Sequence, residues 1–262
     1  MSLPGATPEQ ADTGGIVIPG VVAFGDALAM ERAMLDGLAN PAEVRDEQVV
    51  LAAIWQTERA IILPSGMSRR DGVAEAARRC AAAGWPVHDR ATGGDVTPQF
   101  DGVLNISLGF VLSGTDRNIK AAYERLTAPL IGFLKREFGI VAYTSSVDGA
   151  FCDGAYNLVV GGRKLAGTAQ RWKAIKALHD AEPQETAVLA HAAVLLGGEL
   201  DAALTAANEF FAAWGSERRI NPSAHVTIAE LAGGQAGEPH SFARSLAAFL
   251  SKELGARAPS QS

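Results

Sequence analysis

The segment Cys152-Asp-Gly-Ala-Tyr-Asn-Leu-Val-Val-Gly-Gly-Arg-Lys-Leu-Ala-Gly-Thr-Ala-Gln170 is the most informative part of the chain. It predicts a loop that bears a thiol, a short strand over 156–160, a tight turn at Gly161-Gly162, and a second strand that begins at Arg163. The strands on either side of such a turn fix the direction of Lys164, which suits a cation that must meet one oxygen atom. A strand-edge lysine that only keeps the edge from pairing has the same sequence, so this residue alone does not identify a site.

The remaining chain predicts clusters of strands separated by helices. Apolar runs predict strands over 15–24, 49–55, 60–63, 85–89, 102–110, 141–145 and 186–196. Helical patterns predict helices over 27–38, 69–83, 116–138, 172–180, 201–214 and 240–254. Asp26 is expected to cap the first of these helices. Because strands and helices do not alternate regularly, the predicted fold class is α+β, with a mixed, largely antiparallel sheet flanked by helices.

Composition limits the function classes that fit this chain. Its 262 residues, of which 48% are hydrophobic, allow one domain of about 200 residues and a smaller piece. The first 14 residues are polar and rich in glycine and proline, and we expect a disordered tail there. The net charge of −6 argues against nucleic-acid binding, which needs a basic face. Two cysteines, no signal peptide and no apolar run of about 18 residues predict a cytoplasmic protein without a membrane span.

Three further features could carry chemistry. The loop Arg90-Ala-Thr-Gly-Gly94 could present backbone N–H groups to an anion or a carbonyl, although a tight loop without a ligand has the same letters. Cys152 lies in a loop and not in an apolar run, and it is a candidate nucleophile or an incidental thiol, whereas Cys80 is expected to pack. His191 lies in an apolar strand, which is typical of a hydrogen-bonded core histidine but also allows a role as a base or in substrate positioning. Histidines and cysteines show no metal-ligand spacing, and the glycines form neither a Walker loop nor a dinucleotide fingerprint.

Four segments follow one another along the chain: Arg90-Ala-Thr-Gly-Gly94, Val103-Leu-Asn-Ile-Ser-Leu108, Asn157-Leu-Val-Val-Gly-Gly-Arg-Lys-Leu-Ala-Gly-Thr-Ala-Gln170 and His191-Ala-Ala-Val-Leu-Leu196. Their order and spacing resemble the biotin/lipoate A/B protein ligase superfamily, which includes lipoate–protein ligases and octanoyl/lipoyl transferases. The resemblance covers roughly residues 20–200. It implies a class II biotin/lipoyl synthetase-like catalytic domain over 15–200, a helical C-terminal extension over 201–262, and a buried tunnel for a medium-length acyl chain.

The resemblance also implies roles for individual residues. Lys164 would contact the acyl carbonyl, and Gly93 and Gly94 would line the tunnel. Cys152, which precedes Lys164 by twelve residues, is similar to the loop cysteine that one branch of transferases uses. The other substrate-binding positions that the resemblance implies are Arg90, Thr92, Asn157, Gly167, Thr168, Ala169 and His191.

Two branches of the family differ in chemistry. Ligases activate lipoate or octanoate with ATP and Mg²⁺, whereas transferases move the acyl group between carriers and require no cofactor. In this chain Asn157 stands where ligases carry a metal-linked acid, and the loss of a carboxylate weakens a Mg²⁺ site. The run Gly93-Gly-Asp-Val-Thr-Pro-Gln-Phe100 also departs from the ligase pattern.

These departures favour transfer of an octanoyl or lipoyl group through Cys152, with no metal at the site. The acceptor would be the lysine of a lipoyl domain or of a glycine-cleavage H-type protein, and the donor an acyl carrier protein or a lipoyl protein. Two alternatives stay open: an ATP-dependent lipoate ligase that needs ATP and Mg²⁺, and a non-catalytic acyl-binding relative. Neither the donor, the acyl chain length, a possible accessory chain nor the oligomeric state follows from the sequence.

Overall fold

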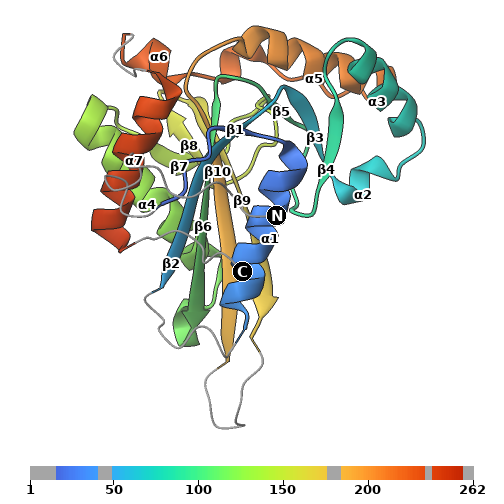
Figure 1. Ribbon diagram of the computed structural model, residues 1–262. Coiled ribbons are helices and arrows are strands. Elements are labelled where there is room, and N and C mark those ends of the chain that lie inside the picture. Colours follow the sequence, from blue (N-terminus) through green and yellow to red (C-terminus); the bar gives the residue numbers. More distant parts are fainter. Residues whose placement is uncertain (1–15, 41–48, 176–183, 234–237, 256–262) are drawn as a thin grey trace.

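The computed structural model describes residues 16–40, 49–175, 184–233 and 238–255 (Figure 1). Its centre is a seven-stranded sheet in the order β1-β2-β6-β10-β9-β8-β7. All neighbouring strands of this sheet run antiparallel except β1 and β2, which are parallel. The fold-class prediction of a mixed, largely antiparallel sheet is therefore confirmed. In sheet order the strands are β1 (Val21–Val22), β2 (Val50–Thr57), β6 (Val103–Ser113), β10 (Glu185–Leu195), β9 (Arg163–Ala174), β8 (Asn157–Val160) and β7 (Tyr143–Ser145).

A second sheet of three strands lies beside the first, in the order β4 (Val87–Arg90), β3 (Ala60–Pro64) and β5 (Thr97–Gln99). The short helix α2 (Ser65–Ser68) follows β3. The helices α3 (Val73–Ala82) and α5 (Leu200–Trp214) pack on each other beside this sheet (Figure 1). Cys80 on α3 is buried in the same apolar cluster as Phe210 and Phe211, so its predicted packing role is confirmed.

Helices cover both faces of the large sheet (Figure 1). On one face lies α1 (Phe24–Leu38), whose buried residues pack on β2, β6 and β10. On the other face lie α4 (Ile119–Phe138) and α7 (Pro239–Leu254), where Phe133 meets Phe242 and Phe249 edge to face. The helix α4 starts where the Asn118 side chain accepts the backbone N–H of Ala121. The short α6 (Ile228–Leu231) precedes α7.

Several element predictions were wrong or incomplete. A helix over 172–180 was expected, but β9 continues to Ala174 because its residues 166–174 all pair with β10. Residues 176–183 lie outside the described part. The helix α1 begins at Phe24 after Ala23, so Asp26 lies in its first turn, where a carboxylate is favourable, and is not the cap. The strand β5 was not predicted. The strands β2 and β3, although adjacent in sequence, enter different sheets.

The helices that follow residue 200 complete both cores. Leu204 and Phe210 of α5 join the cluster beside the small sheet, and Phe242 and Leu246 of α7 join the cluster on the large sheet. The tail over 1–14 lies outside the described residues, and the division of the chain at residues 15 and 200 stays a prediction. Among the described helices, none is long and apolar enough to cross a membrane.

Candidate active site

The hairpin that joins β8 and β9 places Lys164 inside the protein. Gly161 and Gly162 have φ values of 57° and 78°, and a two-residue hairpin turn with positive φ at both positions favours glycine. Two residues beyond the turn, Lys164 pairs with Val159 of β8. Its side chain is 0% exposed. The local geometry of the turn therefore sets the direction of this lysine, and the predicted hairpin is confirmed.

The Lys164 ammonium group faces the loop that carries Cys152. Its Nζ donates hydrogen bonds to the backbone oxygens of Phe151 at 2.6 Å and of Cys152 at 2.9 Å. Burial lowers the pKa of Lys164 to about 8, although the negative charges of Cys152 and Asp153 act to raise it. A Cβ added to Gly167 would lie 3.1 Å from Nζ, so glycine at this position leaves room for the amine. Lys164 is thus a buried amine that can gain or lose a proton near neutral pH.

The Cys152 sulfur has two polar partners. It lies 3.2 Å from the backbone nitrogen of Asp95 and 3.3 Å from Arg90 Nη2, both of which donate. Burial disfavours the thiolate, but the charges of Arg90 and Lys164, the Asp95 N–H and the Thr97 hydroxyl hold the pKa of the Cys152 thiol below its usual value. The residue also has φ of 40°, which is a strained conformation outside glycine. A surrounding network therefore holds this thiol in an unusual backbone conformation.

The glycine loop between β4 and β5 supplies one wall of the thiol site. Arg90 ends β4, and its Nη2 also donates to the Asp95 backbone oxygen at 3.1 Å. Gly94 has φ of 107°, and a Cβ there would lie 2.6 Å from the Cys152 sulfur and 2.7 Å from Arg90 Nη2. A Cβ on Gly93 would meet no described atom within 4 Å. The sequence grouped the two glycines, whereas the structure gives only Gly94 a close contact with the thiol.

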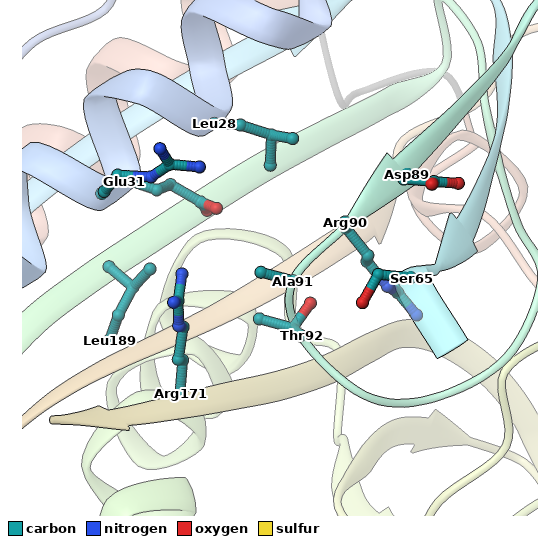
Figure 2. Close-up of a pocket in the computed structure, with 10 residues that line it drawn as sticks. Leu28, Glu31, Ser65, Asp89, Arg90, Ala91, Thr92, Arg171 and Leu189 are labelled. Atoms are coloured by element: carbon teal, nitrogen blue, oxygen red, sulfur yellow. The ribbon is translucent and has the colours of Figure 1, made fainter. Parts of the chain in front are cut away.

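A hollow of about 150 Å³ opens between α1 and the strands beside Arg90 (Figure 2). In Figure 2, Glu31 of α1, Arg171 of β9 and Thr92 of the glycine loop surround it. The Thr92 hydroxyl is buried and has no hydrogen-bond partner among the described residues. A second hollow of about 40 Å³ also borders Arg90 and is lined by apolar groups such as Trp55 together with polar ones. Arg90, whose guanidinium contacts the Cys152 sulfur, lines both hollows.

His191 belongs to a chain of polar groups at the smaller hollow. Its Nδ1 lies 3.3 Å from Glu31 Oε1, which also accepts the Ser107 hydroxyl at 2.7 Å. Trp55 Nε1 in turn donates to Ser107 Oγ at 3.1 Å. Burial opposes ionisation of Glu31, but His191, Ser107 and Arg90 together lower the pKa of its carboxyl. His191 is therefore not surrounded only by apolar core, and Glu31 is a site residue to which sequence reasoning gave no role.

Two other predicted binding residues hold the cysteine loop. The buried Asn157 donates from Nδ2 to Asp153 Oδ1 at 2.6 Å, and the Thr168 hydroxyl donates to the Tyr156 backbone oxygen at 2.9 Å. Ala169 lies opposite His191 in the register of β9 and β10. Sequence reasoning gave no role to Asp95, Thr97 and Arg218, which contact the site. His225 contacts the site as well, through the Phe151 N–H.

Comparison with known proteins identifies the class of this domain. Residues 24–207 match the Lipoyl protein ligase A/B catalytic domain. The chain is 33% identical to an uncharacterized protein of Cupriavidus necator, covering 80% of this chain and 83% of that protein. It is 31% identical to the octanoyl-[GcvH]:protein N-octanoyltransferase of Kyrpidia tusciae, covering 77% of this chain and 69% of the relative.

Solved structures show the same fold. Lipoate-protein ligase A bound with ATP superposes with a TM-score of 0.63 at 17% identity, covering 94% of this chain and 87% of that one. A bi-partite lipoate protein ligase from Thermoplasma acidophilum gives 0.58 at 15% identity, with 94% and 86% covered. The chain therefore belongs to the lipoyl protein ligase A/B family, and the resemblance seen in the sequence is confirmed. The matched region ends at residue 207, before the segment that contains Arg218 and His225.

Proposed function

We propose that this enzyme transfers an octanoyl or lipoyl group to the lysine of a lipoyl-carrier domain through a thioester on Cys152. One observation carries the proposal: the Cys152 sulfur lies against two hydrogen-bond donors, Arg90 Nη2 and the Asp95 N–H, with the buried Lys164 amine behind the same loop. A thiol whose pKa is lowered in this way is a competent acyl nucleophile. Membership of the family and the similarity to a named octanoyltransferase support the acyl group.

The first half-reaction acylates Cys152. Its thiolate forms a carbon–sulfur bond with the carbonyl carbon of the donor, and the bond to the donor's sulfur or nitrogen breaks. A thiol donor leaves as a thiolate, whereas an amine leaving from an amide takes a proton from Lys164. The positive charges of Arg90 and Lys164 favour the oxyanion that forms on the acyl oxygen between these steps. Lys164, with a pKa of about 8, can donate this proton and remain neutral afterwards.

The second half-reaction returns the enzyme to its starting state when the donor is an amide. The amine of the acceptor lysine attacks the thioester carbonyl, and the carbon–sulfur bond breaks to release the Cys152 thiolate. The proton that the attacking amine loses passes to neutral Lys164. No nucleotide is consumed, because the overall reaction exchanges the amide bond of the donor for an amide bond of the product, and these two bonds have similar free energies.

The ATP-dependent route requires a site for Mg²⁺ and nucleotide. At the position where ligases carry a metal-linked acid, Asn157 offers a neutral amide that donates to Asp153. Asp153 Oδ1 also accepts the Val147 backbone N–H at 2.8 Å, so this carboxylate holds the loop. Hard cations favour anionic oxygens, and these two side chains do not fit a metal site at this position.

Two reactions separate the routes. In one, an octanoylated H-type protein or octanoyl-carrier protein is the donor, a lipoyl domain is the acceptor, and no nucleotide is present. In the other, free octanoate or lipoate is supplied with ATP and Mg²⁺. We expect acylated lipoyl domain only from the protein donor. Acylation only from the free acid, with pyrophosphate release, would overturn the proposal in favour of a ligase.

The covalent step has its own test. Mass spectrometry of the Cys152 peptide after incubation with the octanoyl donor should show one octanoyl group. The Cys152→Ser variant should lack this adduct and should transfer slowly. A Cys152→Ser enzyme that transfers at the full rate would exclude the thioester, and transfer by another group at the site would then be the conclusion.

A further inference from the structure

A segment beyond the family-matched region ties together the three parts of the site. Residues 218–226, here called the strap, follow α5. Arg218 Nε lies 2.8 Å from Asp95 Oδ2 of the glycine loop. The Asn221 N–H donates to the Gly149 backbone oxygen at 2.8 Å, next to the cysteine loop. The Val226 N–H donates to the backbone oxygen of Lys164 at 2.9 Å. The strap thus contacts the glycine loop, the cysteine loop and the lysine strand at once.

His225 makes the most specific of these contacts. It is 3% exposed, and its ring stacks on that of Phe151 with centroids 4.9 Å apart and planes at 8°. The Phe151 N–H donates to His225 Nε2 at 3.2 Å, while Nδ1 lies 3.1 Å from the Asn221 backbone oxygen. A carbonyl oxygen only accepts, so Nδ1 carries the proton and Nε2 presents its lone pair. Both contacts therefore require one tautomer of the neutral imidazole.

The residue held by His225 directly precedes the nucleophile. Phe151 is fixed at its N–H by His225 and at its carbonyl oxygen by Lys164. Cys152 then takes φ of 40°, a conformation that costs roughly 1–3 kcal/mol and persists only when the surroundings impose it. With Phe151 fixed at both ends, the next residue has little freedom to relax. The Cys152 sulfur is consequently directed at Arg90 and the Asp95 N–H.

We propose that His225 is a positioning residue for the Cys152 thiol, acting through the backbone of Phe151. The inference rests on the proposed role of Cys152 as the nucleophile. It gives this buried histidine more than a packing role, because the group that it binds sets the position of a reacting atom.

The charges around the ring keep it in the required state. Lys164 of β9 faces His225, and burial together with this ammonium lowers the pKa of His225 to about 4. The ring therefore stays neutral above about pH 4. A His225 variant leaves in the chain the other groups that interact electrostatically with Cys152, which are Arg90, Lys164, Tyr123 and the Asp95 N–H.

The test compares three variants of the full chain. His225→Phe keeps an aromatic ring against Phe151 but removes the acceptor, and His225→Gln restores an acceptor at a similar reach. Phe242→Leu, in the core of α7, is the matched control for lost packing. The readouts are the pH profile of iodoacetamide alkylation at Cys152, followed by peptide mass spectrometry, and kcat and KM for acyl transfer.

We expect His225→Phe to shift the alkylation profile to higher pH and to lower kcat by about 100-fold, since a misplacement near 1 Å costs this much. KM should change by no more than about twofold, and His225→Gln should recover kcat to within about threefold of wild type. Phe242→Leu should lower the thermal midpoint without moving the alkylation profile. A His225→Phe enzyme that loses only thermal stability, with kcat and the profile unmoved, would overturn the proposal.

One measurement needs no variant. Nitrogen NMR of the wild-type imidazole should show Nδ1 protonated and Nε2 as the hydrogen-bonded acceptor, and a ring protonated at Nε2 would contradict the geometry. The alkylation profile also separates this proposal from the proposed function. If His225 controls the profile but wild-type enzyme forms no acyl adduct, the thioester route fails while the positioning of the thiol stands.

Discussion

A methyl group at Gly94 is the smallest change that should disable the site. Because φ at this position is 107°, alanine would be strained by roughly 1–3 kcal/mol before any contact is counted. Its Cβ would lie 2.6 Å from the Cys152 sulfur and 2.7 Å from Arg90 Nη2. Ordinary contacts of such atoms are about 3.5–4.0 Å, so the thiol and the guanidinium must each move about 1 Å away from the new Cβ.

The expected effect on catalysis follows from that displacement. A shift of about 1 Å costs about 100-fold in rate, or about 2.7 kcal/mol in the activation barrier. We therefore predict that Gly94→Ala lowers kcat by about 100-fold, slows alkylation of Cys152 at neutral pH, and lowers the free energy of unfolding by about 1–3 kcal/mol. The assay is transfer from octanoylated donor protein to a lipoyl domain, with urea unfolding in parallel.

The neighbouring glycine supplies the control. A Cβ on Gly93 would meet no described atom within 4 Å, and Gly93 does not have positive φ. Gly93→Ala should consequently keep kcat within about threefold of wild type and change the free energy of unfolding by less than about 1 kcal/mol. Equal losses in the two variants would refute the argument, because the loop would then be sensitive to any side chain and not to contact with the thiol.

Three further predictions concern charged groups. Folding holds the pKa of His225 at about 4 against its usual value of 6.5, so the unfolded chain binds more protons between these pH values. Wild-type stability should fall by up to about 3 kcal/mol as pH drops from 6.5 to 4, and His225→Gln should lack that part of the slope in urea unfolding. Arg90→Gln should shift the alkylation profile of Cys152 to higher pH, and an unmoved profile would mean that the guanidinium does not stabilise the thiolate. Asn157→Asp would place a second carboxylate against Asp153, where the amide nitrogen now lies 2.6 Å from Oδ1. This variant should destabilise the protein by about 1–3 kcal/mol at neutral pH and by less in acid, and equal losses at both pH values would contradict repulsion between the carboxylates as the cause.

The parts of the site that the sequence predicts are local. The Gly161-Gly162 turn acts over two residues, and it fixes the direction of Lys164 without help from distant segments. Cys152 could be selected because it lies in a loop outside any apolar run. The family motifs added the order of these elements and hence the class of the fold.

The parts that the sequence does not predict depend on contacts between distant residues. The contact of His225 cannot be found from the sequence, since its partner Phe151 lies 74 positions away. Glu31 lies on the buried side of α1, and a role becomes visible only when β10 brings His191 to its carboxylate. The sequence does show that Glu31 lies four residues after Ala27 and four before Leu35, which places an acid on an otherwise apolar helix face.

The error at 172–180 has a similar cause. Trp172 and its neighbours were expected to form a helix, but they extend β9 because β10 offers a continuous partner, with Trp172 opposite Val188. Pairing with a neighbouring strand overrode the local preference. Asp95 was likewise missed, because its backbone N–H reaches the sulfur only through the positive φ of Gly94.

The most direct test of the account is the kinetic competence of the acyl-enzyme. Octanoyl-labelled enzyme is freed of donor, mixed rapidly with a lipoyl domain, and quenched at intervals while label on the Cys152 peptide and on the acceptor lysine is counted. The account predicts that the label leaves Cys152 and appears on the lysine at a rate equal to or above kcat. Label that never forms on Cys152, or that stays there while the enzyme turns over, would contradict it.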